Sequence, residues 1–419
     1  MSLPILLDKS TFQGLNYGNI IELHRYYDVT IAPLLVNEIL GDLSKEEKKG
    51  KITPKDMVIN LSKKMFPYNA YVNMRHGIVI EKSLLGEFIG ADNRPFLIAD
   101  RSISSQGKNG LKFKETEEEK SVKRWKEGKF DNLDEIISDL WRSESKDDNV
   151  IDDFKKCFEH LADIKRHMGD SKERNKKLSD EEELKELKAL KARFLERMNV
   201  ELEPEEALLK MLEYFKIDSK TTEAIFHRWN SESFPDLETF AEYTFYCYSI
   251  VSMYYIGINN NLLGERKTNL LDLEYLFYAP FAKVFSTNDK FLVTLYNVIE
   301  PKGVTIISLL SLKEDLAKFQ KLNTPDNWSR YPPDKDTETF KIWDKTFNLK
   351  LSGRLKPTEK DKERAKKELD EILKLAESGE SGIFNGEPDF VVKQSYYSLN
   401  DPCPCKSGKA LKDCHMKNR

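Results

Sequence analysis

The sequence predicts an α/β protein in which a parallel sheet flanked by helices is interrupted by a large, mainly helical insertion. Residues 3–7 form a short, continuous apolar run, which is typical of a strand buried on both faces in a parallel sheet. A helical stretch at 17–26 separates this run from a second apolar run at 29–32, which leads through Pro33 into residues with helical spacing. This alternation of strand and helix indicates an open parallel sheet.

The same alternation returns after Pro235. Residues 269–282 are predicted to form a helix, 283–286 a short strand, 289–298 a helix and 304–310 a final buried strand. In the segment before Pro235, Ser179 and Glu182 make a capping box at the start of an amphipathic helix, and residues 77–112 are expected to be a loop. Aromatic residues with helical spacing at 243–258 indicate a core helix.

Shifts in composition divide the chain into consecutive parts. The segments are 1–44 and 236–312 as the two pieces of the sheet domain, 45–235 as the helical insertion, 313–398 as a charged helical connector, and 399–419 as a zinc-binding motif. Thr358 is a candidate N-cap within the connector, which is expected to be a semi-rigid spacer.

The composition restricts the class of protein. The net charge of −4 excludes a globally basic nucleic-acid binder, so any contact with nucleic acid must use local patches. No apolar run reaches the length of a membrane span, and no membrane partner is expected. Cys157 and Cys247 lie in helical, apolar contexts and are predicted to be buried thiols, which fits a cytoplasmic location.

The end of the chain carries a compact set of metal ligands. Cys403 and Cys405 are one residue apart, and the pair Cys414 and His415 follows on the far side of a glycine-containing turn. Four soft ligands in so short a segment predict a closed, structural Zn²⁺ site, whose bound metal provides the folding energy. The run from Asn-Asp-Pro-Cys403 to Cys414-His415 resembles the SEC-C motif, although Lys406 replaces the customary glycine. The motif implies a docking function on RNA, a ribosome or a protein partner.

Four carboxylates fall where strands end or where helices face the predicted sheet. Asp8 ends the first strand, Glu38 lies on the helix after the second, Asp272 lies on the helix after the insertion, and Asp289 follows the strand at 283–286. Open α/β sheets bind ligands outside the carboxyl ends of their strands, and oxygen ligands suit Mg²⁺ or Mn²⁺. Taken singly, an Asp after a strand is more often a helix N-cap, and a Glu on a helix is usually solvated.

The segments that contain these acids resemble the PIN-like nucleases. Leu-Leu-Asp8-Lys-Ser-Thr-Phe resembles the first acidic strand of that family, and Leu-Val-Asn-Glu38-Ile-Leu resembles its helical glutamate. The run from Asp272 to Thr287-Asn-Asp289 resembles the third acid, helix, strand and closing Thr-x-Asp. The resemblance covers roughly 120 residues in two pieces, and the long insertion between the second and third acids departs from a compact PIN domain.

The resemblance implies a PIN-like sheet and a metal-dependent endoribonuclease. Asp8, Glu38, Asp272 and Asp289 would then bind catalytic Mg²⁺ or Mn²⁺, and RNA would be the substrate. Two alternatives remain open. One is a non-catalytic adaptor built on a degenerate PIN-like fold, and the other is a structure-specific DNA nuclease. The sequence specifies neither the RNA target nor the oligomeric state, and it does not choose among RNA-processing, toxin and phage-defence roles.

Overall fold

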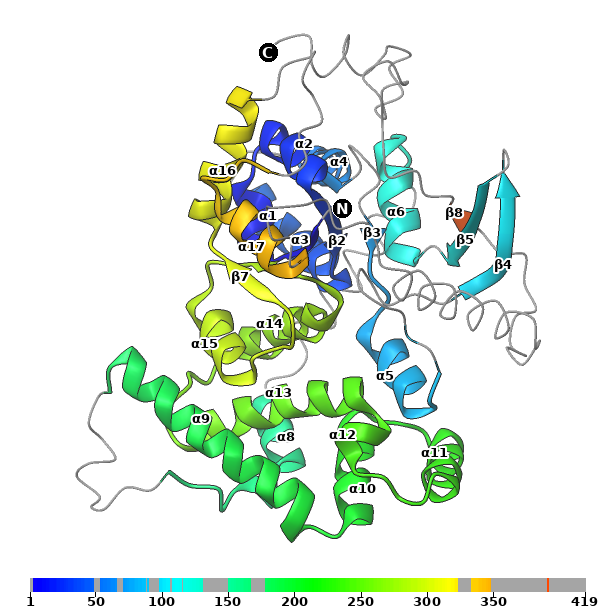
Figure 1. Cartoon of the computed structure of the whole chain (residues 1–419), viewed down its shortest axis with the longest axis vertical. Coiled ribbons are helices and arrows are strands. Elements are labelled where there is room, and N and C mark those ends of the chain that lie inside the picture. Colours follow the sequence, from blue (N-terminus) through cyan, green and yellow to red (C-terminus); the bar gives the residue numbers. More distant parts are fainter. Residues whose placement is uncertain are drawn as a thin grey trace.

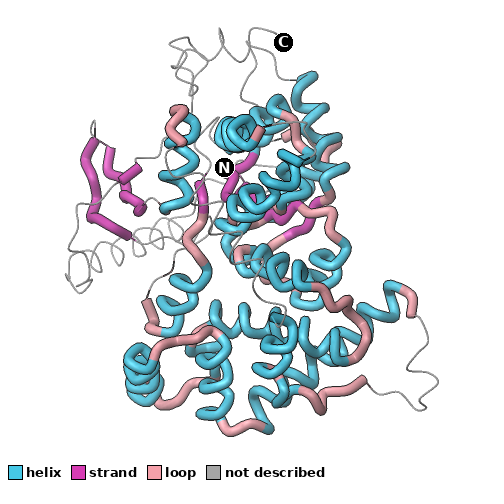
Figure 2. The backbone as a smooth tube through the Cα atoms, turned by 180° about the vertical axis from the view of Figure 1, so that it is seen from behind, coloured by secondary structure: helices cyan, strands magenta, loops and turns pink. Residues whose placement is uncertain are grey.

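The computed structural model of the chain describes residues 3–48, 53–65, 71–87, 89, 98–105, 108–114, 116–130, 150–166, 178–322, 333–347 and 390–391. A helix-flanked sheet forms one end of the molecule, and a group of helices forms the other (Figure 1). A small second sheet lies to one side, and the view from behind shows the same arrangement (Figure 2). Within the described ranges, no helix combines the length and the apolarity that crossing a membrane requires.

The main sheet is built from five strands, β1 (Leu3–Leu7), β2 (Tyr27–Ile31), β3 (Tyr71–Val72), β6 (Val284–Ser286) and β7 (Thr305–Ile307). All neighbouring strands are parallel, and their order is β3-β2-β1-β6-β7. In the central strand β1, Ile5 pairs with Val29 on one side and with Val284 on the other. Every residue of β1 is buried, as its continuous apolar run predicts.

Helices from both halves of the chain flank this sheet. Their bounds are α1 (Lys9–Gly14), α2 (Tyr17–Tyr26), α3 (Pro33–Lys48), α4 (Pro54–Met65), α14 (Lys267–Phe277), α15 (Lys290–Ile299), α16 (Leu309–Leu322) and α17 (Glu338–Phe347). The predicted helix at 17–26 is confirmed as α2, and Asp289 is confirmed as the residue that opens α15. Helix α3 packs against α1, α4 and α14, so it joins elements from both sides of the insertion.

The helical part of the insertion packs around one long buried helix. The helices of the insertion are α5 (His76–Leu84), α6 (Glu117–Lys126), α8 (Val150–Cys157), α9 (Asp180–Glu196), α10 (Pro204–Tyr214) and α11 (Ser219–Ser231), of which α6 packs against α4 and β3. The short helix α12 (Leu237–Phe240) and the long buried helix α13 (Glu242–Asn259) follow the insertion in the chain. Helix α13 is the predicted aromatic core helix, and nearly all of its residues are buried. The capping box of Ser179 and Glu182 is also confirmed, at the start of α9.

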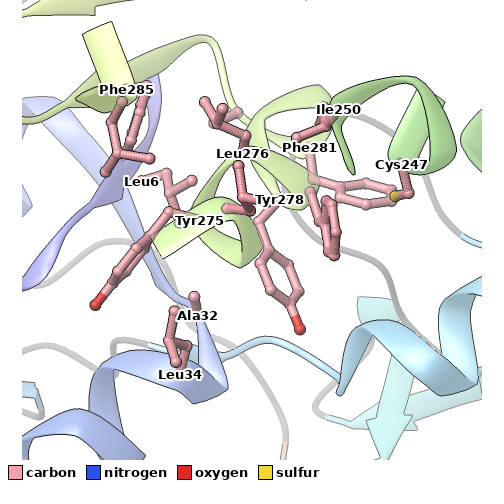
Figure 3. Close-up of a cluster of buried hydrophobic side chains, with 14 of the residues drawn as sticks. Leu6, Ala32, Leu34, Cys247, Ile250, Tyr275, Leu276, Tyr278, Phe281 and Phe285 are labelled. Atoms are coloured by element: carbon pink, nitrogen blue, oxygen red, sulfur yellow. The ribbon is translucent and has the colours of Figure 1, made fainter. Parts of the chain in front are cut away.

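The core is continuous between the sheet and the helical group. Figure 3 shows Leu6 and Phe285 of the sheet beside Leu276 of α14, with Cys247 and Ile250 of α13 on the far side of the cluster. Helix α13 packs against both α14 and α15. The hydrogen bond from Tyr246 Oη to the Leu276 carbonyl, 2.8 Å long, adds a polar link between α13 and α14. The helical group therefore supports the helix that carries Asp272.

Strand β3 shows that the segment after residue 45 also contributes to the sheet. It forms the outer strand next to β2, with Ile31 paired to Val72 and the Asn73 amide bonded to the Ile31 carbonyl at 2.7 Å. On the same strand, the Val72 amide donates to Glu119 Oε1 of α6 at 3.0 Å. Glu119 also completes the capping box of α6 with Thr116. Two residues are too few to give a strand pattern, so the sequence did not predict β3.

Three sequence predictions were wrong in detail. Part of the expected loop at 77–112 belongs to α5 and to the antiparallel strands β4 (Ile98–Ser105) and β5 (Lys108–Lys114), which form the second sheet with β8 (Phe390–Val391). Backbone pairing defines these strands, and a Ser- and Gly-rich sequence does not signal it. The strand expected at 304–310 is shorter, because α16 begins at Leu309. Cys157 is exposed, since α8 buries the face of Ile151 and Phe154 instead.

Two of the predicted segment boundaries fall inside helices. Helix α3 continues through residue 44, and α16 continues through residue 312. The first part of the predicted connector therefore packs on the sheet domain: α16 lies against α2, with Phe319 stacked on Tyr26 at a ring distance of 4.0 Å, and α17 lies against α16. Thr358 and the rest of the connector up to residue 389 lie outside the described residues.

A buried carboxylate attaches α17 to the sheet domain. Asp315 of α16 is 3% exposed, and its Oδ2 accepts hydrogen bonds from the amide and the hydroxyl of Thr339, both at 2.7 Å. Its Oδ1 accepts from the Glu338 amide at 3.3 Å. The Thr339 hydroxyl is also bonded to the hydroxyl of Tyr27 at 2.7 Å, which extends the network to β2.

We expect Asp315→Ala to lower the free energy of unfolding by roughly 1–3 kcal/mol, because it leaves buried donors of α17 without an acceptor. Urea unfolding followed by tryptophan fluorescence measures this change, since Trp343 lies on α17 and is buried. Glu314→Ala is the matched control, because the neighbouring Glu314 is exposed. Equal losses in the two variants would contradict the role assigned to Asp315.

Candidate acidic site

The site lies at the carboxyl edge of the main sheet, where β1 and β6 end side by side. Leu7 pairs with Ser286, and the Asp8 amide donates to the Ser286 carbonyl at 3.2 Å. Asp8 and the segment from Thr287 to Asp289 therefore leave the sheet at the same place. Parallel strands make this convergence unavoidable, because their carboxyl ends share one edge.

Asp8 is buried and acts as the N-cap of α1. Its Oδ1 accepts from the Thr11 amide at 2.7 Å, and its Oδ2 accepts from the Thr287 hydroxyl at 2.6 Å. The Ser10 hydroxyl lies 2.8 Å from Oδ2 and 3.0 Å from Oδ1. The capping interpretation of an Asp after a strand is therefore correct for this residue, and the cap also fixes the carboxylate at the edge of the sheet.

Asp289 is held in a similar way at the end of β6. Its Oδ1 caps α15 by accepting from the amides of Phe291 at 2.7 Å and Leu292 at 3.2 Å. Its own amide donates to the Thr287 hydroxyl at 3.0 Å, and that hydroxyl donates to Asp8. Thr287 thus connects the two strand-end acids through one oxygen atom.

Glu38 approaches the site from α3. Its Oε2 accepts a short hydrogen bond from the hydroxyl of Tyr275 on α14, and its Oε1 lies 3.8 Å from Lys9 Nζ. Burial raises the pKa of Glu38, and the Tyr275 hydrogen bond and Lys9 oppose that rise. Asp42 and Asp8 raise the pKa further through their negative charges. The residue is therefore not a solvated glutamate on an outer helix face.

Asp272 lies on α14, one turn before Tyr275. Within the described part of the chain it makes no hydrogen bond or ion pair. Its pKa is raised to about 7, mainly by burial and further by the negative charges of Glu38, Asp289 and Asp8. The fold thus brings the four predicted acids close enough for Asp272 to interact electrostatically with each of the other three. Glu274, two residues further along α14, instead contacts His76 at 3.3 Å.

The donor set suits a hard divalent cation, although the carboxylates are not drawn together around one point. Among the described residues, no three His, Cys, Asp or Glu side chains are grouped closely enough to hold a metal ion. The contacts above give the physical reason: Asp8 and Asp289 are engaged by amides and hydroxyls, and Glu38 by Tyr275. Burial is the main cause of the raised pKa of Asp272, and the neighbouring negative charges, which a cation would offset, raise it further.

Sequence reasoning missed three residues that act on the acids: Tyr275 and Lys9 contact Glu38, and Asp42 contacts Lys9. Tyr275 follows Asp272 by one helical turn, and this spacing is the signal that could have identified it. Lys9 is adjacent to Asp8 in the chain, and Asp42 follows Glu38 by one turn of α3. Their spacing is visible in the sequence, but their function depends on the packing of α1, α3 and α14.

Comparison with known proteins identifies a motif near the end of the chain. The SEC-C motif family model matches residues 400–417, a segment that contains Cys403, Cys405, Cys414 and His415. These four predicted Zn²⁺ ligands lie outside the described residues. No curated protein and no solved structure matches the chain. The SEC-C prediction is thus confirmed as a motif, and the resemblance to PIN-like nucleases stays a prediction.

We expect Asp272→Asn to raise the melting temperature by about 2 °C or more at pH 8 in the presence of EDTA. The pKa of Asp272 rises from 3.8 to about 7 on folding, so stability falls as pH increases through that range and the buried carboxyl ionises. The variant removes this cost, and its advantage over wild type should therefore be smaller at pH 5 than at pH 8. Differential scanning fluorimetry across pH measures the difference.

Glu274→Gln is the matched control, because Glu274 lies on the same helix but faces His76. It should give no such gain at pH 8. An Asp272→Asn variant that is less stable than wild type at both pH values would contradict the raised pKa of Asp272.

We expect Cys403→Ser and Cys414→Ser to abolish Zn²⁺ binding by the purified chain, because a serine hydroxyl does not replace a thiolate ligand. Metal analysis by inductively coupled plasma mass spectrometry gives the zinc content directly. Cys157→Ser is the control, since Cys157 is an exposed thiol outside the motif. Wild-type zinc content in the Cys403→Ser and Cys414→Ser variants would exclude the predicted ligand set.

Proposed function

We propose that this protein is a metal-dependent nuclease that hydrolyses phosphodiester bonds in RNA. The observation that supports it most strongly is the convergence of Asp8, Glu38, Asp272 and Asp289 from four different elements at one edge of a parallel sheet, where the charges of the other three act on Asp272. Structural carboxylates are commonly paired with cations or dispersed, because grouping them costs stability. A carboxyl whose pKa is raised to about 7, first by burial and then by three neighbouring acids, therefore favours a functional site.

In this proposal the chain holds the cation through Asp8, Glu38, Asp272 and Asp289. A divalent ion bound there supplies an activated water and offsets charge on the scissile phosphate. The protein's contribution is to position the acids: Thr287 and the α1 cap orient Asp8, and Tyr275 orients Glu38. Asp272, with its pKa near neutrality, can hold or release a proton at its carboxylate.

Two cationic residues lie at the start of the helix that carries Asp272. Arg266 and Lys267 are exposed at the start of α14, one to two turns before Asp272. Their position suits contacts to the phosphates of a strand that enters the site. The choice of RNA over DNA rests on the resemblance to PIN-like nucleases, because phosphate contacts alone do not distinguish the two.

A second function is favoured by the SEC-C match. The motif at 400–417 fits a docking element, and a protein with this element could act as a non-catalytic adaptor. In that case the four acids would no longer form a catalytic site, and the helical insertion and the zinc motif would be the recognition surfaces. Within the nuclease proposal, the same motif would bring the enzyme to RNA, a ribosome or a protein partner.

We expect wild-type protein to cleave a mixed pool of single-stranded RNA in Mn²⁺ or Mg²⁺, and Asp8→Asn or Asp289→Asn to reduce the rate by on the order of 100-fold or more. Asparagine caps helices as well as aspartate does, so both variants should keep α1 and α15 folded. Gel analysis of end-labelled RNA measures the rate. Asp218→Asn is the matched control, because Asp218 caps α11 in the helical insertion.

The substrate panel decides among the alternatives. DNA of the same sequence and branched DNA are tested in parallel, and preferred cleavage of branched DNA would support a structure-specific DNA nuclease. If folded, zinc-loaded wild type cleaves none of these substrates, the adaptor function becomes the better explanation. Equal cleavage by wild type and both site variants would assign the activity to a contaminant.

A further inference from the structure

Lys9 places a positive charge against the acidic site. It is the first residue of α1, and its half-buried ammonium lies 2.6 Å from Asp42 Oδ2 and 3.8 Å from Glu38 Oε1. Asp42 follows Glu38 by one turn of α3, so the two carboxylates lie on the same face of that helix. Lys9 also opposes the rise in the pKa of Asp272 on α14. One ammonium thus acts on carboxylates from two helices.

Lys9 Nζ lies closer to Asp42 than to Glu38, and this difference bears on how a divalent ion can bind Glu38. The contact with Asp42 is a tight ion pair, whereas that with Glu38 is at the outer limit of one. Glu38 Oε2 is held by the Tyr275 hydroxyl, so Oε1, which faces Lys9, is the oxygen left for a cation. A divalent ion that binds Glu38 Oε1 must compete with the ammonium. Asp42 lies where it can hold the Lys9 ammonium once the ammonium moves away from Glu38.

We infer that Lys9 is the resident counter-ion of the acidic site, and that a divalent cation binds by displacing it from Glu38 onto Asp42. This inference rests on the proposed function, because it assumes that the four acids are a metal site. It adds a residue that tunes metal affinity without being a ligand. Asp42 acts through Lys9: it holds the ammonium away from Glu38, and it thereby favours metal binding.

Lys9 and Asp42 should have opposite effects on the affinity of the site for metal. We expect Lys9→Met to tighten Mn²⁺ binding by roughly fivefold, because it removes the competing charge. Asp42→Asn should weaken binding by a similar factor, since the ammonium then remains with Glu38. In the double variant, Asp42→Asn should have no further effect, because its target is gone. This pattern separates an action through Lys9 from a direct attraction of Asp42 for the metal.

The experiment uses the full, zinc-loaded chain with Mn²⁺ as the probe, at about pH 8, above the pKa of Asp272. Electron paramagnetic resonance of free Mn²⁺ gives the dissociation constant without any turnover. Asp272→Asn identifies the binding that belongs to the acidic site. Lys64→Met is the matched control, because the Lys64 ammonium, also half-buried, donates to the carbonyls of Phe12 and Gln13 on α1. It should leave the dissociation constant unchanged.

The outcomes distinguish this inference from the proposed function. Equal Mn²⁺ affinity in wild type and Lys9→Met would overturn the inference and leave the metal site in place. A further loss on adding Asp42→Asn to Lys9→Met would overturn it too, because Asp42 would then act on the metal directly. Absence of Asp272-dependent binding in every variant would overturn both. The expected binding pattern without RNA cleavage would support the inference and count against nuclease activity.

Discussion

The hydrogen bond from Thr287 to Asp8 is the interaction on which the acidic site depends. It is 2.6 Å long and joins residues 279 positions apart, at the ends of two neighbouring strands. Because the Thr287 hydroxyl also accepts from the Asp289 amide, a single side chain sets the relative positions of both strand-end acids. This bond and the β1–β6 pairing join the two halves of the sheet directly, across the long insertion between them.

The charges at this edge oppose folding, and their neighbours offset part of the cost. Burial and mutual repulsion raise the pKa of Asp272 and of Glu38, while Tyr275 and Lys9 counter the rise at Glu38. An arrangement that lowers stability and persists is typical of a site kept for function. Helix α13 also supports the site. It packs against α14, which carries Asp272, and against α15, which Asp289 caps.

Residues close in sequence to a strong local signal were predictable, and residues whose function depends on packing were not. Asp8 and Asp289 follow apolar strands, and the SEC-C motif lies within one short segment, so both patterns are visible without a structure. The contact of Tyr275 with Glu38 requires α3 and α14 to be neighbours across a separation of 237 residues. Strand β3 has no pattern of its own, because pairing with β2 alone defines it.

The position of Glu119 affects whether two copies of this protein can pair through the edge of the main sheet. Strand β3 is the outer strand of the sheet, and an outer strand offers unpaired amides to any other extended chain. Its Val72 amide is already bonded to the Glu119 carboxylate, which brings a negative charge to that edge. A second molecule that extended the sheet there would have to break this bond and displace the buried Glu119 carboxylate. The insertion that splits the domain therefore also protects it against edge-to-edge aggregation.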